Sequence, residues 1–175
     1  MTHERRNSDL WKSRQIITSI IQVLEEIIVE NATDAELLPV IQKQTRLPFC
    51  VRKVPKISKY CYIERILKYS RIEESTLILS LIYIDKVCEV NNLLLTEFNI
   101  HRIIFTSLLV SIKYNEDEYY SNSFYAKVAG LSLREVNMLE NEFLKMMDFK
   151  LFVNDETFVK YRDYLKKYRI KGVVN

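Results

Sequence analysis

Two apolar helical patterns between His101 and Phe149 each contain a single charged residue. Lys113 ends a nearly unbroken apolar run that begins at Ile103. Glu140 falls on a stripe whose spacing of three and four residues marks one helix face, together with Leu133, Val136, Phe143 and Met147. A buried ion without a partner is costly, so each charge needs one. An ion pair between Lys113 and Glu140 would satisfy both.

The composition favours helices over strands. The chain of 175 residues is 48% hydrophobic and 28% charged, and it contains only two Gly. That is too few for the many tight turns of an all-β protein. The length suits one domain with a true core. We therefore predict an all-α protein.

Capping signals and apolar periodicity predict where the helices lie. Ser58 is an expected N-cap, and Ser132 with Glu135 matches a capping box. Gly130 can take the left-handed conformation that often ends a helix. The stretch from 103 to 112 is apolar on nearly every side, so its helix is expected to be the central one. The expected helices cover roughly 10–30, 34–44, 59–69, 74–90, a stretch that follows 96 or 99 and extends to 114, 122–129, 132–147, and a last segment that starts near 154 or 155.

The expected organisation has three parts. Residues 1–56 form an N-terminal helix and a connector that holds all three prolines, 57–153 form the main helical unit, and 154–175 form a C-terminal helix and tail. The helix over 10–30 is amphipathic. Two interpretations of its apolar face stay open, packing onto the main unit or docking a partner protein, and the first is preferred.

Composition and motifs exclude several classes of function. A net charge of +3 is too small to indicate a nucleic-acid partner, and basic groups such as Arg52, Lys53 and Lys56 are interpreted as solvated surface. The apolar run stops at Lys113, short of the roughly twenty residues that a membrane span needs. The start, MTHERRNSDLWKS, lacks the apolar core of a secretory signal. A soluble protein is expected.

The usual reaction centres lack their parts. The sequence has only two His and no Gly-rich phosphate loop, HExxH or GxSxG motif, so we expect no catalytic residues, no cofactor and no metal. His101, near the start of the central helix, is expected to be structural. Cys50, Cys61 and Cys88 form no CxxC pair, which indicates a reducing compartment rather than a disulfide scaffold or zinc site.

Two interpretations of Lys113 and Glu140 stay open. The residues either tie two helices together, with Lys113 extending to solvent along its stem, or they are polar anchors at the centre of an apolar binding patch. The patch would consist of Val110, Tyr114, Leu144, Phe149 and Leu151.

Asp85 raises the same question on the helix over 74–90. It falls among apolar residues at helical spacing and therefore needs a cation. Arg65 is the candidate, because a guanidinium can meet a carboxylate with two parallel hydrogen bonds. We interpret this ion pair as structural.

The residues now described resemble those of the cyclins, most closely the phosphate-regulation type, also called P-type or U-type. The resemblance rests on YIERILKYS, LIYIDKV, NIHRIIFTSLLVSIKYNEDEYYSNSFYAKVAG and LSLREVNMLENEFLKMMDFKL, which follow one another between about Ile57 and Tyr161. It implies a single cyclin box of five helices around a central apolar helix, with flanking N-terminal and C-terminal helices. The helix over 10–30 lies outside the resemblance.

The resemblance also implies a function. Lys113 and Glu140 match the family lysine and glutamate that contact a cyclin-dependent kinase beside its regulatory C-helix, and Asp85 matches a family aspartate. We therefore expect a non-catalytic activating subunit that forms a heterodimer with the kinase in the cytoplasm, the nucleus or both. The alternatives are a cyclin-like transcription-factor or nucleic-acid scaffold and a kinase-free helical adaptor.

Overall fold

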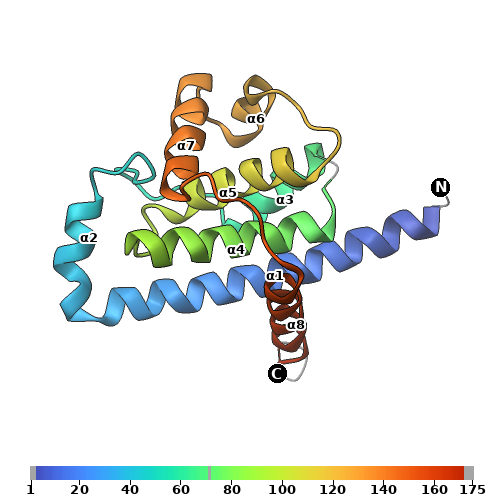
Figure 1. The fold of residues 1–175 in the computed structure, drawn as a ribbon, viewed down its shortest axis with the longest axis horizontal. Helices are drawn as coiled ribbons and strands as arrows, with labels where there is room; N and C mark the ends of the chain where they lie inside the picture. The colour runs from blue at the N-terminus through green and yellow to red at the C-terminus, as the bar shows by residue number, and fades with distance from the viewer. Residues whose placement is uncertain (1–2, 71, 172–175) are drawn as a thin grey trace.

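The computed structural model describes residues 3–70 and 72–171, with side chains for 14–70 and 72–168. Over these ranges the chain is helical with no strand (Figure 1), which confirms the all-α prediction. The elements are α1 (His3–Thr33), the 3-10 turn η1 (Ala35–Leu37), α2 (Leu38–Gln44), α3 (Lys59–Tyr69), α4 (Glu74–Asn91), α5 (Ile100–Asn115), α6 (Asn122–Ala129), α7 (Leu133–Met146) and α8 (Asp155–Lys171).

Local capping chemistry sets three of these boundaries as predicted. The Ser58 hydroxyl accepts a hydrogen bond from the backbone N–H of Cys61 at the start of α3. Ser132 and Glu135 form the capping box of α7. Gly130 ends α6 with φ of 72°, a conformation that costs glycine little.

Helix α5 is the centre of the molecule, with α6 and α7 on one side and α4 on the other, and α1 packs on the far side of α4 (Figure 1). Every residue from 103 to 112 is buried. A helix that is apolar all round is stable only when other elements cover it. The prediction of a central helix over this stretch is confirmed.

The apolar stripe predicted on α7 is present apart from its first member. Val136, Phe143 and Met147 are each at most 2% exposed. Leu133, the first residue of α7, is 46% exposed. The stripe therefore buries α7 from its second turn onward.

The apolar face of α1 packs onto the main unit, which is the preferred of the two interpretations. Ile17 and Leu24 are each 1% exposed, and α1 packs against α3, α4 and α8. The helix is longer than the predicted 10–30, and the side chains of Leu10 and Trp11 lie outside the described residues. Among the described residues, no helix combines the length and the apolar character that crossing a membrane requires.

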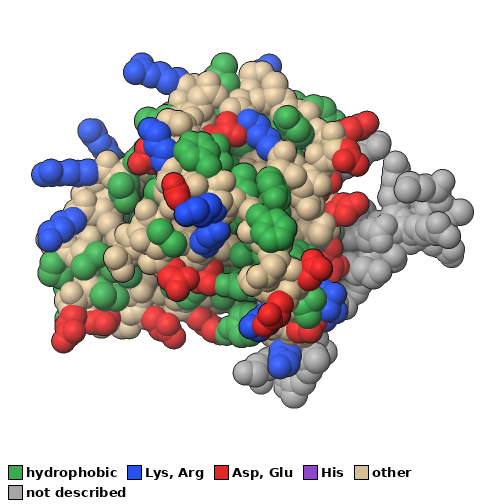
Figure 2. All heavy atoms as spheres, in the orientation of Figure 1, with side chains coloured by type: hydrophobic (Ala, Val, Ile, Leu, Met, Phe, Trp, Pro, Cys, Tyr) green, Lys and Arg blue, Asp and Glu red, His purple; other side chains and the backbone are tan. Residues whose placement is uncertain are grey.

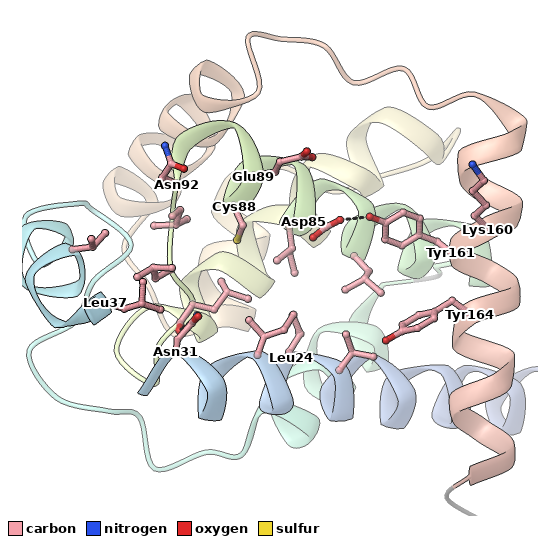
Figure 3. Close-up of a pocket in the computed structure, with 18 residues that line it drawn as sticks. Leu24, Asn31, Leu37, Asp85, Cys88, Glu89, Asn92, Lys160, Tyr161 and Tyr164 are labelled. Atoms are coloured by element: carbon pink, nitrogen blue, oxygen red, sulfur yellow. Dashed lines mark hydrogen bonds between the residues drawn. The ribbon is translucent and has the colours of Figure 1, made fainter. Parts of the chain in front are cut away.

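The expected Arg65–Asp85 ion pair is not formed. Both side chains are exposed, and none of the ion pairs among the described residues joins them. Asp85 instead accepts a hydrogen bond from the Tyr161 hydroxyl of α8, at the edge of a hollow of about 1030 Å³ between α1, α4 and α8 (Figure 3). The reason is packing: α4 contacts α8, whereas α3 contacts α1, α5 and α6.

Candidate functional site

Lys113 and Glu140 meet where α5 and α7 come together. Lys113 lies in the last turn of α5, where the helix dipole favours a cation. Its Nζ lies 2.6 Å from Glu140 Oε1, and the two side chains remain 28% and 15% exposed. The ion pair therefore lies at the edge of the core, where a second protein can still contact it.

Asn122 of α6 extends the ion pair, and the sequence analysis missed it. Its Nδ2 donates to Glu140 Oε2 over 2.7 Å and to Asn137 Oδ1 over 2.8 Å. The two carboxylate oxygens of Glu140 thus have donors from two different helices, which fixes the carboxylate in place. An amide at the start of a short helix carries no periodic signal, so only the structure reveals this role.

The apolar patch around the pair differs from the predicted one in one member. Val110 is 3% exposed and belongs to the core, so its prediction as a contact residue is wrong. Tyr114 is 49% and Phe149 63% exposed, while Leu144 and Leu151 are half-buried. Figure 2 shows hydrophobic side chains gathered on this face of the molecule, along the segment that joins α7 to α8.

Phe152 is a further exposed aromatic residue of the same segment, and the sequence analysis did not name it. Its side chain is 75% exposed. It follows Leu151 in the extended stretch between α7 and α8, where no helical period distinguishes inward from outward residues. We define the anchor patch as Lys113, Glu140, Tyr114, Leu144, Phe149, Leu151 and Phe152.

Side chains of α4 donate hydrogen bonds to the backbone at the end of α7 and in the segment after it. The Tyr83 hydroxyl donates to the Leu151 carbonyl over 2.8 Å, and Lys86 Nζ donates to the Lys150 carbonyl over 2.6 Å. Asn91 Nδ2 donates to the carbonyl of Met146 at the end of α7 over 3.0 Å. Burial raises the pKa of the Tyr83 hydroxyl, so it remains protonated and keeps donating.

A strained backbone turn presents Phe149. The N–H of Asp148 bonds the Lys145 carbonyl and the N–H of Phe149 bonds the Leu144 carbonyl, each over 2.9 Å, which is the Schellman pattern of helix ends. Asp148 and Phe149 have φ of 51° and 54°. Left-handed backbone costs a non-glycine residue about 1–2 kcal/mol. Such strain is kept where surrounding contacts enforce it, often at functional sites.

A known protein family matches the stretch of chain that contains this site. The sequence matches the family model described as Cyclin over residues 14–151. The chain belongs to the cyclin family. The match begins at residue 14, so this cyclin's first helix is part of the family pattern, although the sequence analysis placed it outside.

Relatives with curated names support the subtype. This cyclin is 34% identical to Cyclin-U4-1 of Arabidopsis thaliana over 154 residues, which cover 87% of this chain and 75% of that protein. It is 36% identical to Cyclin-U4-3 of the same plant, covering 94% and 75%. PHO85 cyclin-7 of Saccharomyces cerevisiae is 32% identical, covering 88% and 61%. These findings confirm the resemblance to phosphate-regulation cyclins.

His101 and Cys88 of this cyclin are both held in place by their neighbours in the fold. His101 Nε2 lies 2.9 Å from the Ile57 carbonyl, and its ring packs edge-on against Tyr62 at 5.5 Å. Cys88 is half-buried on α4, close to Asp85. Burial, with a smaller contribution from the Asp85 carboxylate, raises the pKa of the Cys88 thiol to about 12.

We expect the three thiols of this cyclin to react at different rates. Cys61 is exposed, whereas burial raises the pKa of both Cys50 and Cys88. A thiol whose pKa lies far above the solution pH holds little reactive thiolate. Titration of the native protein with a thiol-specific chromophore at pH 8 is expected to show Cys61 reacting first, and denaturation is expected to equalise the three. Equal rates in the native protein would contradict the burial described here.

Proposed function

We propose that this cyclin is a non-catalytic regulatory subunit that binds a cyclin-dependent protein kinase and activates it by packing against the kinase C-helix. The observation that carries the proposal is a partly exposed Lys113–Glu140 ion pair beside exposed aromatic residues. A charged pair within an apolar surface gives an interface its register and orientation, because a misplaced partner would bury the remaining donors and acceptors of the pair without hydrogen bonds.

The hydrogen-bonding capacity of the pair suits a partner backbone. The Lys113 ammonium carries three N–H donors, and Glu140 takes one of them. The remaining donors are available to carbonyl groups at the end of a partner helix. Glu140 retains acceptor capacity for partner N–H groups, since each carboxylate oxygen accepts more than one bond.

The apolar members of the anchor patch would supply the binding energy. Tyr114, Phe149 and Phe152 are aromatic and at least 49% exposed, and burying such side chains dominates the energetics of many interfaces. A protein kinase is active only when its C-helix is held inward, so that a lysine–glutamate pair forms over the nucleotide. A partner that packs on the C-helix favours this position. The phosphoryl transfer itself belongs to the kinase.

Capture from the native cell tests this function. The full chain carrying an affinity tag is expected to retain a kinase catalytic chain in equal amount, identified by mass spectrometry. Reconstitution of the two purified chains is expected to give a heterodimer by size-exclusion chromatography and a rise in kinase activity. Consistent absence of a kinase from the captured material would favour the adaptor alternative, and binding without activation would refute the C-helix mechanism.

Replacing Phe149 with glycine is expected to separate stability from binding. Glycine accepts φ of 54° without steric cost, and its greater freedom in the unfolded chain offsets only part of that gain. Thermal stability should therefore stay equal or rise, while kinase affinity falls because the 63% exposed ring is lost. Tyr69→Ala, which removes an exposed aromatic ring from α3, is the matched control and should retain binding. Loss of stability in Phe149→Gly would show that the turn is not strained.

A further inference from the structure

The positive charge of this chain is concentrated in one segment. From Leu37 to Ile63 it carries six Lys and Arg and no Asp or Glu, whereas the remainder of the chain has a net negative formal charge. The segment comprises α2, the connector and the start of α3. Lys and Arg side chains project from the edge of the molecule that α2 and the connector form, on the left in Figures 1 and 2. This asymmetry is hidden in the small net charge of the whole chain.

Two arginines of this segment and one from α5 line a hollow of about 960 Å³. Arg46 and Arg52 come from the connector, and Arg102 comes from the first turn of α5. Thr45 and Asn99 add polar groups, and Glu142 of α7 is its acidic lining residue. Phe98 and Met138 lie at the same hollow and are 50% and 45% exposed. The lining therefore combines several cations with an apolar rim.

The connector that carries Arg46 and Arg52 is fixed before any ligand arrives. Phe49 is fully buried, and the N–H of Val51 donates to the Phe98 carbonyl over 2.9 Å. Arg102 Nη1 donates to the Pro48 carbonyl over 2.6 Å. Gln44 Nε2 donates to the Asn92 carbonyl over 2.9 Å. A preformed site loses little conformational entropy on binding.

The guanidinium groups differ in how many of their donors are in use. Arg102 also donates to Glu135 Oε1 over 2.7 Å and is 19% exposed, so it mainly positions the connector. Arg46 and Arg52 are exposed, and none of the ion pairs among the described residues includes them. Both residues line the same hollow, and a guanidinium group can donate two parallel hydrogen bonds to the oxygens of a phosphate.

We infer that this hollow binds a phosphorylated segment of a partner protein, with Arg46 and Arg52 holding the phosphate and the apolar rim holding a neighbouring side chain. A phosphate offers three acceptor oxygens and nearly two negative charges, so it can engage both guanidinium groups at once. A carboxylate offers only two oxygens and one negative charge, so two guanidinium groups attract it less strongly than a phosphate. The volume of about 960 Å³ exceeds what a bare anion fills, which favours a peptide. The assignment is independent of the kinase proposal.

Binding of peptide libraries to the full chain tests this inference. The probes are labelled libraries with a fixed central phosphothreonine, threonine or glutamate, followed by fluorescence anisotropy. The phosphothreonine pool is expected to bind at least tenfold more tightly than the other two. Arg46→Ala and Arg52→Ala should each weaken its binding about tenfold or more, since charge-assisted hydrogen bonds are lost. Lys160→Ala on α8 removes an exposed cation elsewhere and should leave the affinity unchanged.

Two further comparisons distinguish recognition from general attraction of anions. Arg46→Lys and Arg52→Lys keep the positive charge but remove the guanidinium group, which can donate two parallel hydrogen bonds. The affinity for the phosphothreonine pool should therefore still fall severalfold. A uridine homopolymer RNA should bind more weakly than the phosphothreonine pool at physiological salt. Equal binding of the threonine pool, an equal loss in Lys160→Ala, or tighter binding of the RNA would each overturn the inference. All these substitutions are at exposed side chains, so a loss of binding will not reflect unfolding, and circular dichroism verifies this.

Discussion

Lys113→Ala is expected to weaken binding of the kinase by about 2–5 kcal/mol and to leave the cyclin folded. The substitution removes the donors offered to the partner, and it leaves the Glu140 carboxylate, 15% exposed, with Asn122 as its remaining side-chain donor. In the complex that carboxylate would be buried without its counter-ion. Glu140→Ala should have an effect of similar size, because it leaves the ammonium unpaired. Isothermal titration calorimetry with purified kinase measures both.

The matched controls show whether the effect belongs to the ion pair. Lys145→Ala removes an exposed cation of α7 and should bind normally. The double variant of Lys113 and Glu140 should lose less than the sum of the single losses, because the two residues act together. Wild-type affinity in both single variants, with thermal melting unchanged, would move the kinase contact to another face of the molecule.

Phe143→Ala is expected to destabilise the fold by about 3–5 kcal/mol, a large part of the stability of a domain of this size. The ring of Phe143 is fully buried, and its centroid lies 6.2 Å from that of Phe49 in an edge-to-face arrangement. Truncation leaves a cavity between α7 and the connector and removes that contact. Urea denaturation followed by circular dichroism measures the loss.

An exposed position on the same helix provides the comparison for this prediction. Met138 is 45% exposed, and Met138→Ala should change the free energy of unfolding by less than about 0.5 kcal/mol. If the two variants unfolded at the same urea concentration, α7 would not be packed on the core through the face described above.

Features encoded within a few residues were predictable from the sequence. The capping box at Ser132, the N-cap at Ser58 and the left-handed Gly130 depend on neighbours in the chain, and the structure has all three. The proximity of Lys113 to Glu140 was also predictable, because each is the single charge on an apolar pattern. A single charge on an apolar helix face has few oppositely charged residues with which it can pair.

Features that depend on distant packing were not predictable. The acceptor role of Asp85 toward Tyr161 joins residues 76 positions apart, and α4 is apolar on too many sides for its pattern to show which neighbour each residue faces. The same ambiguity on α5 made buried Val110 resemble a surface residue. Phe152 was missed for the opposite reason, since the extended segment has no helical period. The contact of the anchor patch with a kinase stays a prediction.

The hydrogen bonds from α4 to the segment after α7 have a consequence for genetics. Tyr83 is buried and lies outside the anchor patch, yet its hydroxyl fixes the position of the Leu151 backbone. A screen for lost association will therefore recover changes on α4 beside those on the contact surface itself. If such alleles were mapped by phenotype alone, the size of the interface would be overestimated. Tyr83 would be assigned as a contact residue, although it acts through the backbone of Leu151.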